Sequence, residues 1–135
     1  MIKLSKEKPY EDACKILGLR PVANYKSYKL TDETRNFIKL ETVAKALNEG
    51  WKPTTIDPKE VRCYVWGWNY TDNRKPSGLL TVLSNLGLGY ASASVGTSLE
   101  FKDEDTAKEF ARMCKPMIVK YLFGRDDHEN FKFDF

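Results

Sequence analysis

Hydrophobic side chains recur at three- and four-residue spacing in the first half of the chain, and this period predicts two amphipathic helices. The first covers residues 9–18, where Pro9 suits the first helical turn and Gly18 suits a left-handed C-cap. The second covers residues 31–50 and starts with Thr31, whose hydroxyl group is suited to cap a helix N-terminus. Prolines follow the second helix, so regular structure is expected to resume only beyond them.

A third helical pattern lies near the C-terminus, over residues 103–123. Asp103 is its predicted N-cap. Pro116 inside the pattern predicts a kink, because proline lacks an amide hydrogen and clashes with the preceding turn. We therefore expect a single domain over residues 1–124 and a charged, aromatic C-terminal tail over residues 125–135. The tail is expected to be disordered or to join a neighbouring sheet as an edge strand.

Between the second and third helices, the sequence changes to alternating and β-branched positions that predict strands. Residues 61–70 form the first strand, and a turn-rich segment over 71–78 joins it to a second strand over 79–85. Further strands are expected over 86–96 and 97–101, and the short links favour antiparallel pairing. Since the helices must bury their apolar stripes, we predict an α+β fold, with helices packed on one face of an antiparallel sheet of three to four strands.

The first predicted strand, VRCYVWGWNY, carries four large aromatic side chains on one face when it is read with a period of two. These side chains are Tyr64, Trp66, Trp68 and Tyr70. Their amphipathic rings suit a half-wet surface better than a dry core. Three uses remain open: packing in the core, contact with a second copy of the chain, and a platform on which a nucleobase stacks.

The composition narrows the range of partners. The net charge is +3, from 22 basic and 19 acidic residues that are interspersed along the chain. Binding to duplex DNA is therefore not expected, because it usually needs a concentrated basic stripe. The three cysteines form no CxxC pair, which argues against a zinc ribbon and fits a reducing cytoplasm. No apolar run approaches the roughly 18 residues of a spanning helix, so no membrane association is expected.

Residues for catalysis are sparse in the sequence. The single histidine, His128, lies in the charged tail, and no GxSxG, HExxH or P-loop pattern is present. Residues 126–129 combine three acidic side chains with this histidine, but a charge run in a tail is usually solvated. We therefore expect a protein that is not an enzyme and has neither a metal ion nor a cofactor.

The segment LGLGYASASVGTS is rich in glycine and hydroxyl groups. A dinucleotide-binding fingerprint requires a strand, the glycines and then a helix, whereas a strand is predicted on both sides here. A tightly packed or twisted strand is one explanation of the glycines. The other is that the hydroxyl groups bind a phosphate or a sugar, with nearby basic side chains meeting the phosphate charge. The hydroxyl candidates are Ser92, Ser94, Thr97 and Ser98, and the basic candidates are Lys52, Arg74 and Lys75.

Several blocks of the chain resemble, in order, a family of small uncharacterised proteins from phages and prophages of gut bacteria. They are YEDACKILGL, VAKALNEGWKP, the aromatic strand, and GLGYASASVGTSLEFKDEDTAKEFARMCKPMIVKYLF. The LNEGWKP block and the VGTSLEF segment that leads into a helix are the most specific parts, and the resemblance covers about residues 9–123. It departs in the aromatic strand, where related sequences commonly carry a proline and this chain has Gly67 nearby.

The resemblance implies an accessory protein in the cytoplasm of an infected bacterium. Our leading hypothesis is non-catalytic sequestration of a nucleotide-derived ligand, such as a signal of host defence, in a pocket completed by homo-oligomerisation. The aromatic face would stack the base, and the hydroxyl and basic candidates would meet the phosphates. The alternatives are a protein–protein interaction module, single-stranded nucleic-acid binding, which the weak net charge disfavours, and an enzyme acting on a nucleotide signal.

Overall fold

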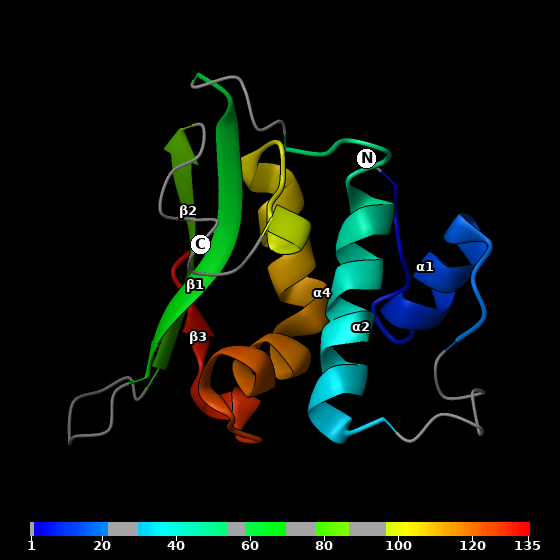
Figure 1. The fold of residues 1–135 in the computed structure, drawn as a ribbon. Coiled ribbons are helices and arrows are strands. Elements are labelled where there is room, and N and C mark those ends of the chain that lie inside the picture. Colours follow the sequence, from blue (N-terminus) through cyan, green and yellow to red (C-terminus); the bar gives the residue numbers. More distant parts are fainter. Residues whose placement is uncertain (1, 22–29, 54–58, 70–77, 87–96) are drawn as a thin grey trace.

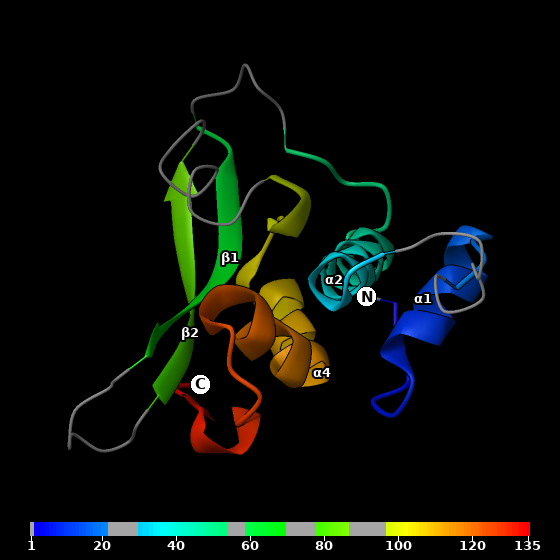
Figure 2. The same cartoon turned by 60° about the horizontal axis from the view of Figure 1, so that its bottom comes forward.

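A computed structural model describes residues 2–21, 30–53, 59–69, 78–86 and 97–135 of the protein. In chain order the elements are α1 (Pro9–Leu17), α2 (Asp32–Leu47), β1 (Val61–Asn69), β2 (Gly78–Leu86), the 3₁₀ helix η2 (Thr97–Leu99), α4 (Glu104–Phe123), the 3₁₀ helix η3 (His128–Asn130) and β3 (Lys132–Phe133). The predicted α+β class is confirmed. In Figures 1 and 2, α4 packs on one face of the sheet, α2 packs on α4, and α1 lies on the far side of α2.

The helix boundaries follow from the capping residues that the sequence indicates. The side chain of Thr31 accepts a hydrogen bond from the amide of Thr34, and the side chain of Asp103 accepts one from the amide of Thr106. At the end of α1, Gly18 adopts a left-handed conformation with φ of +68°. The two side-chain bonds satisfy amides that the helices leave without a partner, and the amide of Gly18 donates to the carbonyl of Lys15 at 3.3 Å. These three predicted helix ends are therefore confirmed.

The kink predicted in the last helix is also present. Cys114 leaves helical geometry, with φ of −114° and ψ of 19°, two residues before Pro116. Beyond the kink, the side-chain amide of Asn36 in α2 donates a hydrogen bond of 2.9 Å to the carbonyl of Met117. The proline therefore redirects the second half of α4, and α2 holds that half in place.

The sheet is mixed rather than antiparallel throughout. β1 and β2 pair antiparallel from Val61 opposite Leu86 to Asn69 opposite Gly78. β3 then pairs with the outer side of β2 in parallel, with Lys132 opposite Leu79. This arrangement gives the order β1-β2-β3 (Figure 1).

The prediction of a fourth strand over residues 97–101 is wrong. They form η2, followed by an isolated antiparallel bridge in which Phe101 and Cys63 exchange both backbone hydrogen bonds, at 2.7 and 2.8 Å. Only one residue pair bonds because η2 occupies the preceding residues. The strand predicted over residues 86–96 falls, apart from Leu86 at the end of β2, outside the described residues.

Residues 125–135 contribute to the hydrophobic core. Phe131 is fully buried and stacks on Phe123 of α4, with the ring centroids 5.2 Å apart. Its ring lies directly over Gly78, where an added Cβ atom would meet the ring at 2.4 Å. Only glycine leaves room for this ring, so the start of β2 and the C-terminal segment fit together.

Candidate functional site

The aromatic face of β1 is not uniformly available to a ligand. A Cβ atom at Gly67 would face Phe123 of α4, so the odd-numbered residues of β1 face the helices and the even-numbered aromatics face away from them. Tyr64 is 9% exposed, Trp66 is half-buried, and Trp68 is 41% exposed. Tyr70 lies outside the described residues. The exposed fraction of these side chains therefore increases along the strand. Three of the four predicted rings are described, and only that of Trp68 is exposed.

A buried ion pair lies on the same side of β1. Arg62 is 1% exposed, and its Nη1 lies 3.5 Å from Oε1 of Glu100, which is fully buried. The side-chain amide of Asn48 donates a hydrogen bond of 3.0 Å to the backbone carbonyl of Glu100. The residue that follows η2 is thus tied both to the sheet and to the C-terminal end of α2. These contacts hold η2 beside that helix end.

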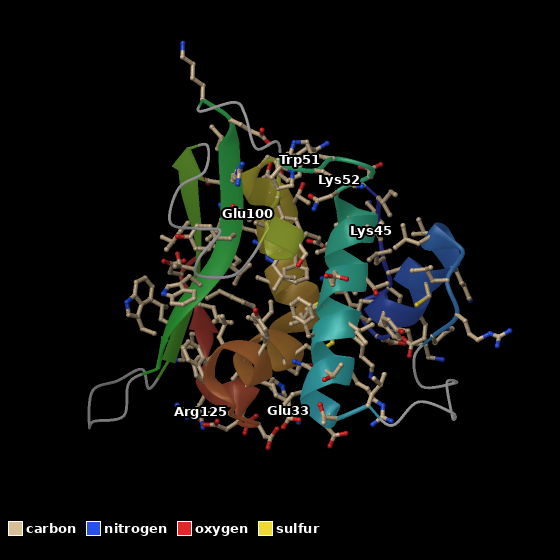
Figure 3. All side chains as sticks on the ribbon, in the orientation of Figure 1. Glu33, Lys45, Trp51, Lys52, Glu100 and Arg125 are labelled. Atoms are coloured by element: carbon tan, nitrogen blue, oxygen red, sulfur yellow. The ribbon has the colours of Figure 1, made fainter. Side chains whose placement is uncertain are left out.

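A cavity of about 370 Å³ opens where the end of α2, the segment after it and η2 meet. Its volume falls within the range typical of small-molecule sites, roughly 300–1,000 Å³. The lining residues are Glu41, Lys45, Asn48, Trp51, Lys52, Pro53 and Ser98. Figure 3 shows Lys45, Trp51 and Lys52 close together at this end of the molecule. Another cavity, lined mainly by apolar side chains between α2, α4 and β1, has a volume of about 10 Å³ and is too small for a ligand.

Local sequence explains how α2 and its C-terminal turn build the cavity. Glu41, Lys45 and Asn48 are spaced at four and three residues, so they share one face of α2. The chain then reverses through Glu49 and Gly50, whose φ angles of +49° and +89° are both positive, as in a mirror-image turn. The amide of Trp51 donates a hydrogen bond of 2.9 Å to the carbonyl of Asn48 and closes the turn. The reversal returns Trp51 and the residue after it to the end of α2.

The charges around the cavity favour an anion in one respect and oppose it in another. In the described part of the chain, neither Lys45 nor Lys52 lies within ion-pair distance of a carboxylate, and no basic group lies within ion-pair distance of Glu41. The three side chains leave a net charge of one positive unit. However, the C-terminal end of a helix carries partial negative charge, which repels anions. An anionic ligand at this position therefore depends on both lysines.

Of the predicted candidates, the structure brings Lys52 and Ser98 together in this cavity. Thr97 lies in η2, but its side chain is not described. The remaining hydroxyl and basic candidates lie outside the described residues; they are Arg74, Lys75, Ser92 and Ser94. Sequence reasoning missed Trp51 and Lys45. The available signal was a tryptophan directly after the glycine at the end of the predicted helix, together with a polar stripe at the end of that helix.

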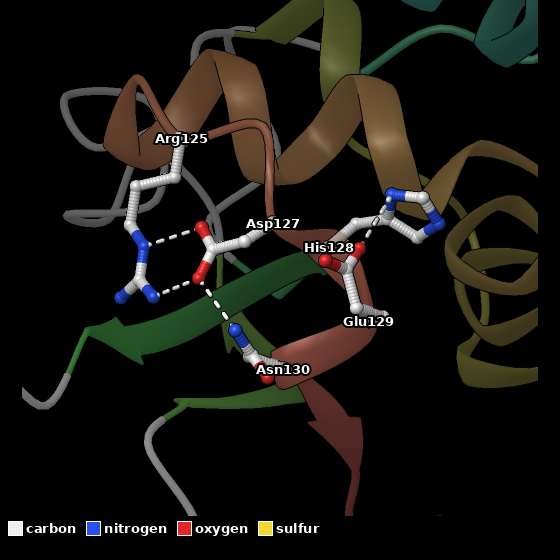
Figure 4. A network of polar contacts seen from close by, with 5 residues as sticks. All are labelled: Arg125, Asp127, His128, Glu129 and Asn130. Carbon is white, nitrogen blue, oxygen red and sulfur yellow. Dashed lines mark hydrogen bonds and ion pairs between the residues drawn. The ribbon is translucent and has the colours of Figure 1, made fainter.

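The charged cluster at the C-terminus forms a structural turn. The guanidinium group of Arg125 donates two hydrogen bonds to the carboxylate of Asp127, one of them 2.7 Å long, and Asn130 donates a third of 2.8 Å (Figure 4). The hydrogen bonds from Arg125 and Asn130 hold the pKa of Asp127 well below its usual range. Arg125 also lies over the ring of Phe131, 4.9 Å from its centroid. Within the described ranges, no group of three or more His, Cys, Asp or Glu side chains is placed to hold a metal ion.

Comparisons with protein-family models, with curated proteins and with solved structures find no match for this chain. In addition, none of the helices described is long and apolar enough to cross a membrane. The case for function therefore depends on the cavity itself.

Proposed function

We propose that the protein binds a small anionic molecule with a flat aromatic ring, of the nucleotide class, in the cavity beside Trp51. It holds this ligand without converting it. The observation that carries the proposal is that one indole, one hydroxyl group and two ammonium groups, which pair with no carboxylate in the described residues, line a cavity of about 370 Å³. Stacking on an indole suits a nucleobase, and ammonium and hydroxyl groups suit phosphate oxygens.

The charges around the cavity predict that binding depends on salt concentration and on both lysines. The negative end of the α2 dipole opposes an anion, so the attraction must come from Lys45 and Lys52. Both side chains are exposed, and attraction between exposed charges is screened by salt. Binding should therefore weaken as ionic strength rises, and it should weaken further when either lysine is removed.

The resemblance to phage proteins suggests a setting for such binding. In the cytoplasm of an infected bacterium, a non-catalytic protein of this kind would act as an accessory factor that sequesters a nucleotide-derived signal. Sequestration needs only affinity and abundance, which agrees with a site proposed to hold its ligand unchanged.

A thermal-shift panel of mononucleotides, cyclic nucleotides and cyclic dinucleotides tests the proposal. A ligand at about 100 times its dissociation constant adds about 2.7 kcal/mol to the free energy of unfolding, so a true ligand gives a clear rise in melting temperature. Lys45→Ala should reduce this rise. Lys39→Ala is the matched control, because Lys39 also lies on α2 but is placed over the ring of Tyr10. Absence of a shift across the panel, or an equal loss in both variants, would reject the site.

Recovery of the bound molecule separates binding from catalysis. Protein saturated with the ligand is denatured by heat, and the released molecule is analysed by mass spectrometry. The proposal expects the ligand to be recovered unchanged after prolonged incubation. A chemically altered product that forms in proportion to the protein would instead favour the enzyme alternative.

A protein-interaction function is the second candidate, because Trp68 leaves 41% of its surface exposed on β1. Its cross-strand neighbour on β2, Leu79, is half-buried. Exposed tryptophan is typical of contact surfaces between proteins. Replacement of Trp68 should leave ligand binding unchanged under the first proposal, so the two functions are separable in one set of variants.

A further inference from the structure

The outer side of β2 can be identified from its hydrogen bonds. The carbonyl of Leu80 accepts a bond of 3.1 Å from the amide of Asp134, so the peptide groups of Leu80 point away from β1 and toward β3. Successive residues of a strand point these groups to alternate sides. The amide and carbonyl groups of Val82, Ser84 and Leu86 therefore point outward as well.

Pairing on β1 supports this assignment. Cys63 directs both of its backbone groups to Phe101, on the side of β1 away from β2. The even-numbered residues of β1 must then direct theirs toward β2, where Tyr64 lies opposite Leu83. Odd-numbered residues of β2 face β1, and even-numbered residues face outward.

β3 covers only the beginning of this edge, because its two residues pair with Leu79 and Leu80. In the part of the chain that the structure describes, no hydrogen bond reaches the outward groups of Val82, Ser84 or Leu86. The edge therefore continues past β3 as a strand whose outward backbone donors and acceptors bond to no group in the described residues.

This edge also lacks the features that usually prevent two edges from pairing. Natural edge strands are commonly protected by charged residues, prolines or bulges. Residues 81–86 read TVLSNL, with no charged residue and no proline, and the ladder to β1 runs through them without a bulge. Ser84 is exposed, and Val82 and Leu83 are half-buried.

We propose that this edge is a self-association surface, on which the β2 strands of two copies pair antiparallel with Ser84 opposite Ser84 of the second copy. In this register Val82 of each copy lies opposite Leu86 of the other, so the outward backbone groups of Val82, Ser84 and Leu86 meet as hydrogen-bonded pairs. A second copy fits better than a charged peptide, because the segment is uncharged and offers the same groups in both directions about a two-fold axis. The two mixed sheets then form one continuous sheet.

Sedimentation velocity over a concentration series tests this surface. The wild-type protein should show a reversible monomer–dimer equilibrium. Ser84→Lys and Ser84→Glu each place like charges opposite one another at the two-fold axis, and each should raise the dimer dissociation constant at least about tenfold. An equimolar mixture of these two variants should dimerise again, because opposite charges then face each other. Ile16→Lys adds a positive charge at an exposed position of α1 and should leave dimerisation unchanged.

A cross-link checks the register directly. Paired residues in an antiparallel ladder have Cα atoms about 5.5 Å apart, a distance that a disulfide bridges. Ser84→Cys should therefore form a covalent dimer on mild oxidation, and the three native cysteines are buried and should not compete. A wild-type protein that stays monomeric at all concentrations would overturn the proposal. It would also be overturned if the lysine variant dimerises like wild type, or if the mixture of charged variants stays monomeric.

Discussion

Gly78 is the point at which the C-terminal segment and the sheet must fit together, and Gly78→Ala tests that fit. The added methyl group would lie 2.4–2.8 Å from three atoms of the Phe131 ring, which is fully buried and stacked on Phe123. Ordinary contacts of a Cβ atom start near 3.4 Å, so the ring must move by about 1 Å into occupied space. Overpacking of this kind costs about 1–3 kcal/mol.

Backbone entropy works in the opposite direction at this position. Replacing glycine by alanine in a strand is otherwise favourable by about 0.5–1 kcal/mol. We therefore expect Gly78→Ala to lower the free energy of unfolding by about 1–2 kcal/mol, measured by urea denaturation.

A double-mutant cycle identifies the cause of this loss. Phe131→Leu shortens the side chain over Gly78, so the alanine should cost less in that background and the two effects should not add. Gly124→Ala is the matched control, because that glycine has φ of +64° and open space around it, and its cost is backbone strain alone. Additive effects of Gly78→Ala and Phe131→Leu, or a Gly78→Ala variant as stable as wild type, would refute the reasoning.

Three shorter predictions concern strain, thiols and pH. Glu49→Gly should raise the free energy of unfolding by about 1 kcal/mol, since Glu49 has a positive φ; a lower melting temperature would contradict this. Burial raises the pKa of Cys63 to about 11 and that of Cys114 to about 12, so native protein should react far more slowly than unfolded protein with a thiol reagent near pH 8. The depressed pKa of Asp127, caused first by the hydrogen bond from Arg125, stabilises the fold above the unfolded pKa of about 4, and this contribution is lost as pH falls toward the folded value. Asp127→Asn should flatten the acid limb of melting temperature against pH.

Local signals in the sequence were sufficient to predict where the helices begin and where the last one kinks. Thr31 and Asp103 cap helices through bonds to residues three positions away, and Pro116 acts on its own helix. Such effects need no knowledge of the rest of the fold. For residues 125–135 the sequence left open disorder or an edge strand. It did not predict the parallel pairing of β3 with β2, because that position depends on the distant contact between Phe131 and Gly78.

In the candidate site, too, sequence reasoning found residues by their own chemistry and missed a residue whose position depends on a distant contact. Lys52 and Ser98 were proposed from their chemistry alone, and they line the cavity. Trp51 was not among the predicted site residues, because its approach to η2 depends on the hydrogen bond from Asn48 to Glu100, which spans 52 positions in the chain. By contrast, the aromatic alternation of β1 suggested a platform, yet Tyr64 is buried. A period of two assigns a residue to a face but not the exposure of that face.

Calorimetric titration of the best nucleotide from the panel tests the central claim most directly, using Trp51→Leu and Trp68→Leu as a matched pair. Stacking on an indole contributes roughly 1–3 kcal/mol, so Trp51→Leu should weaken binding roughly 5- to 150-fold. Trp68→Leu should bind like wild type. Full affinity in the Trp51 variant, or a loss confined to the Trp68 variant, would contradict a nucleotide site in the cavity beside α2.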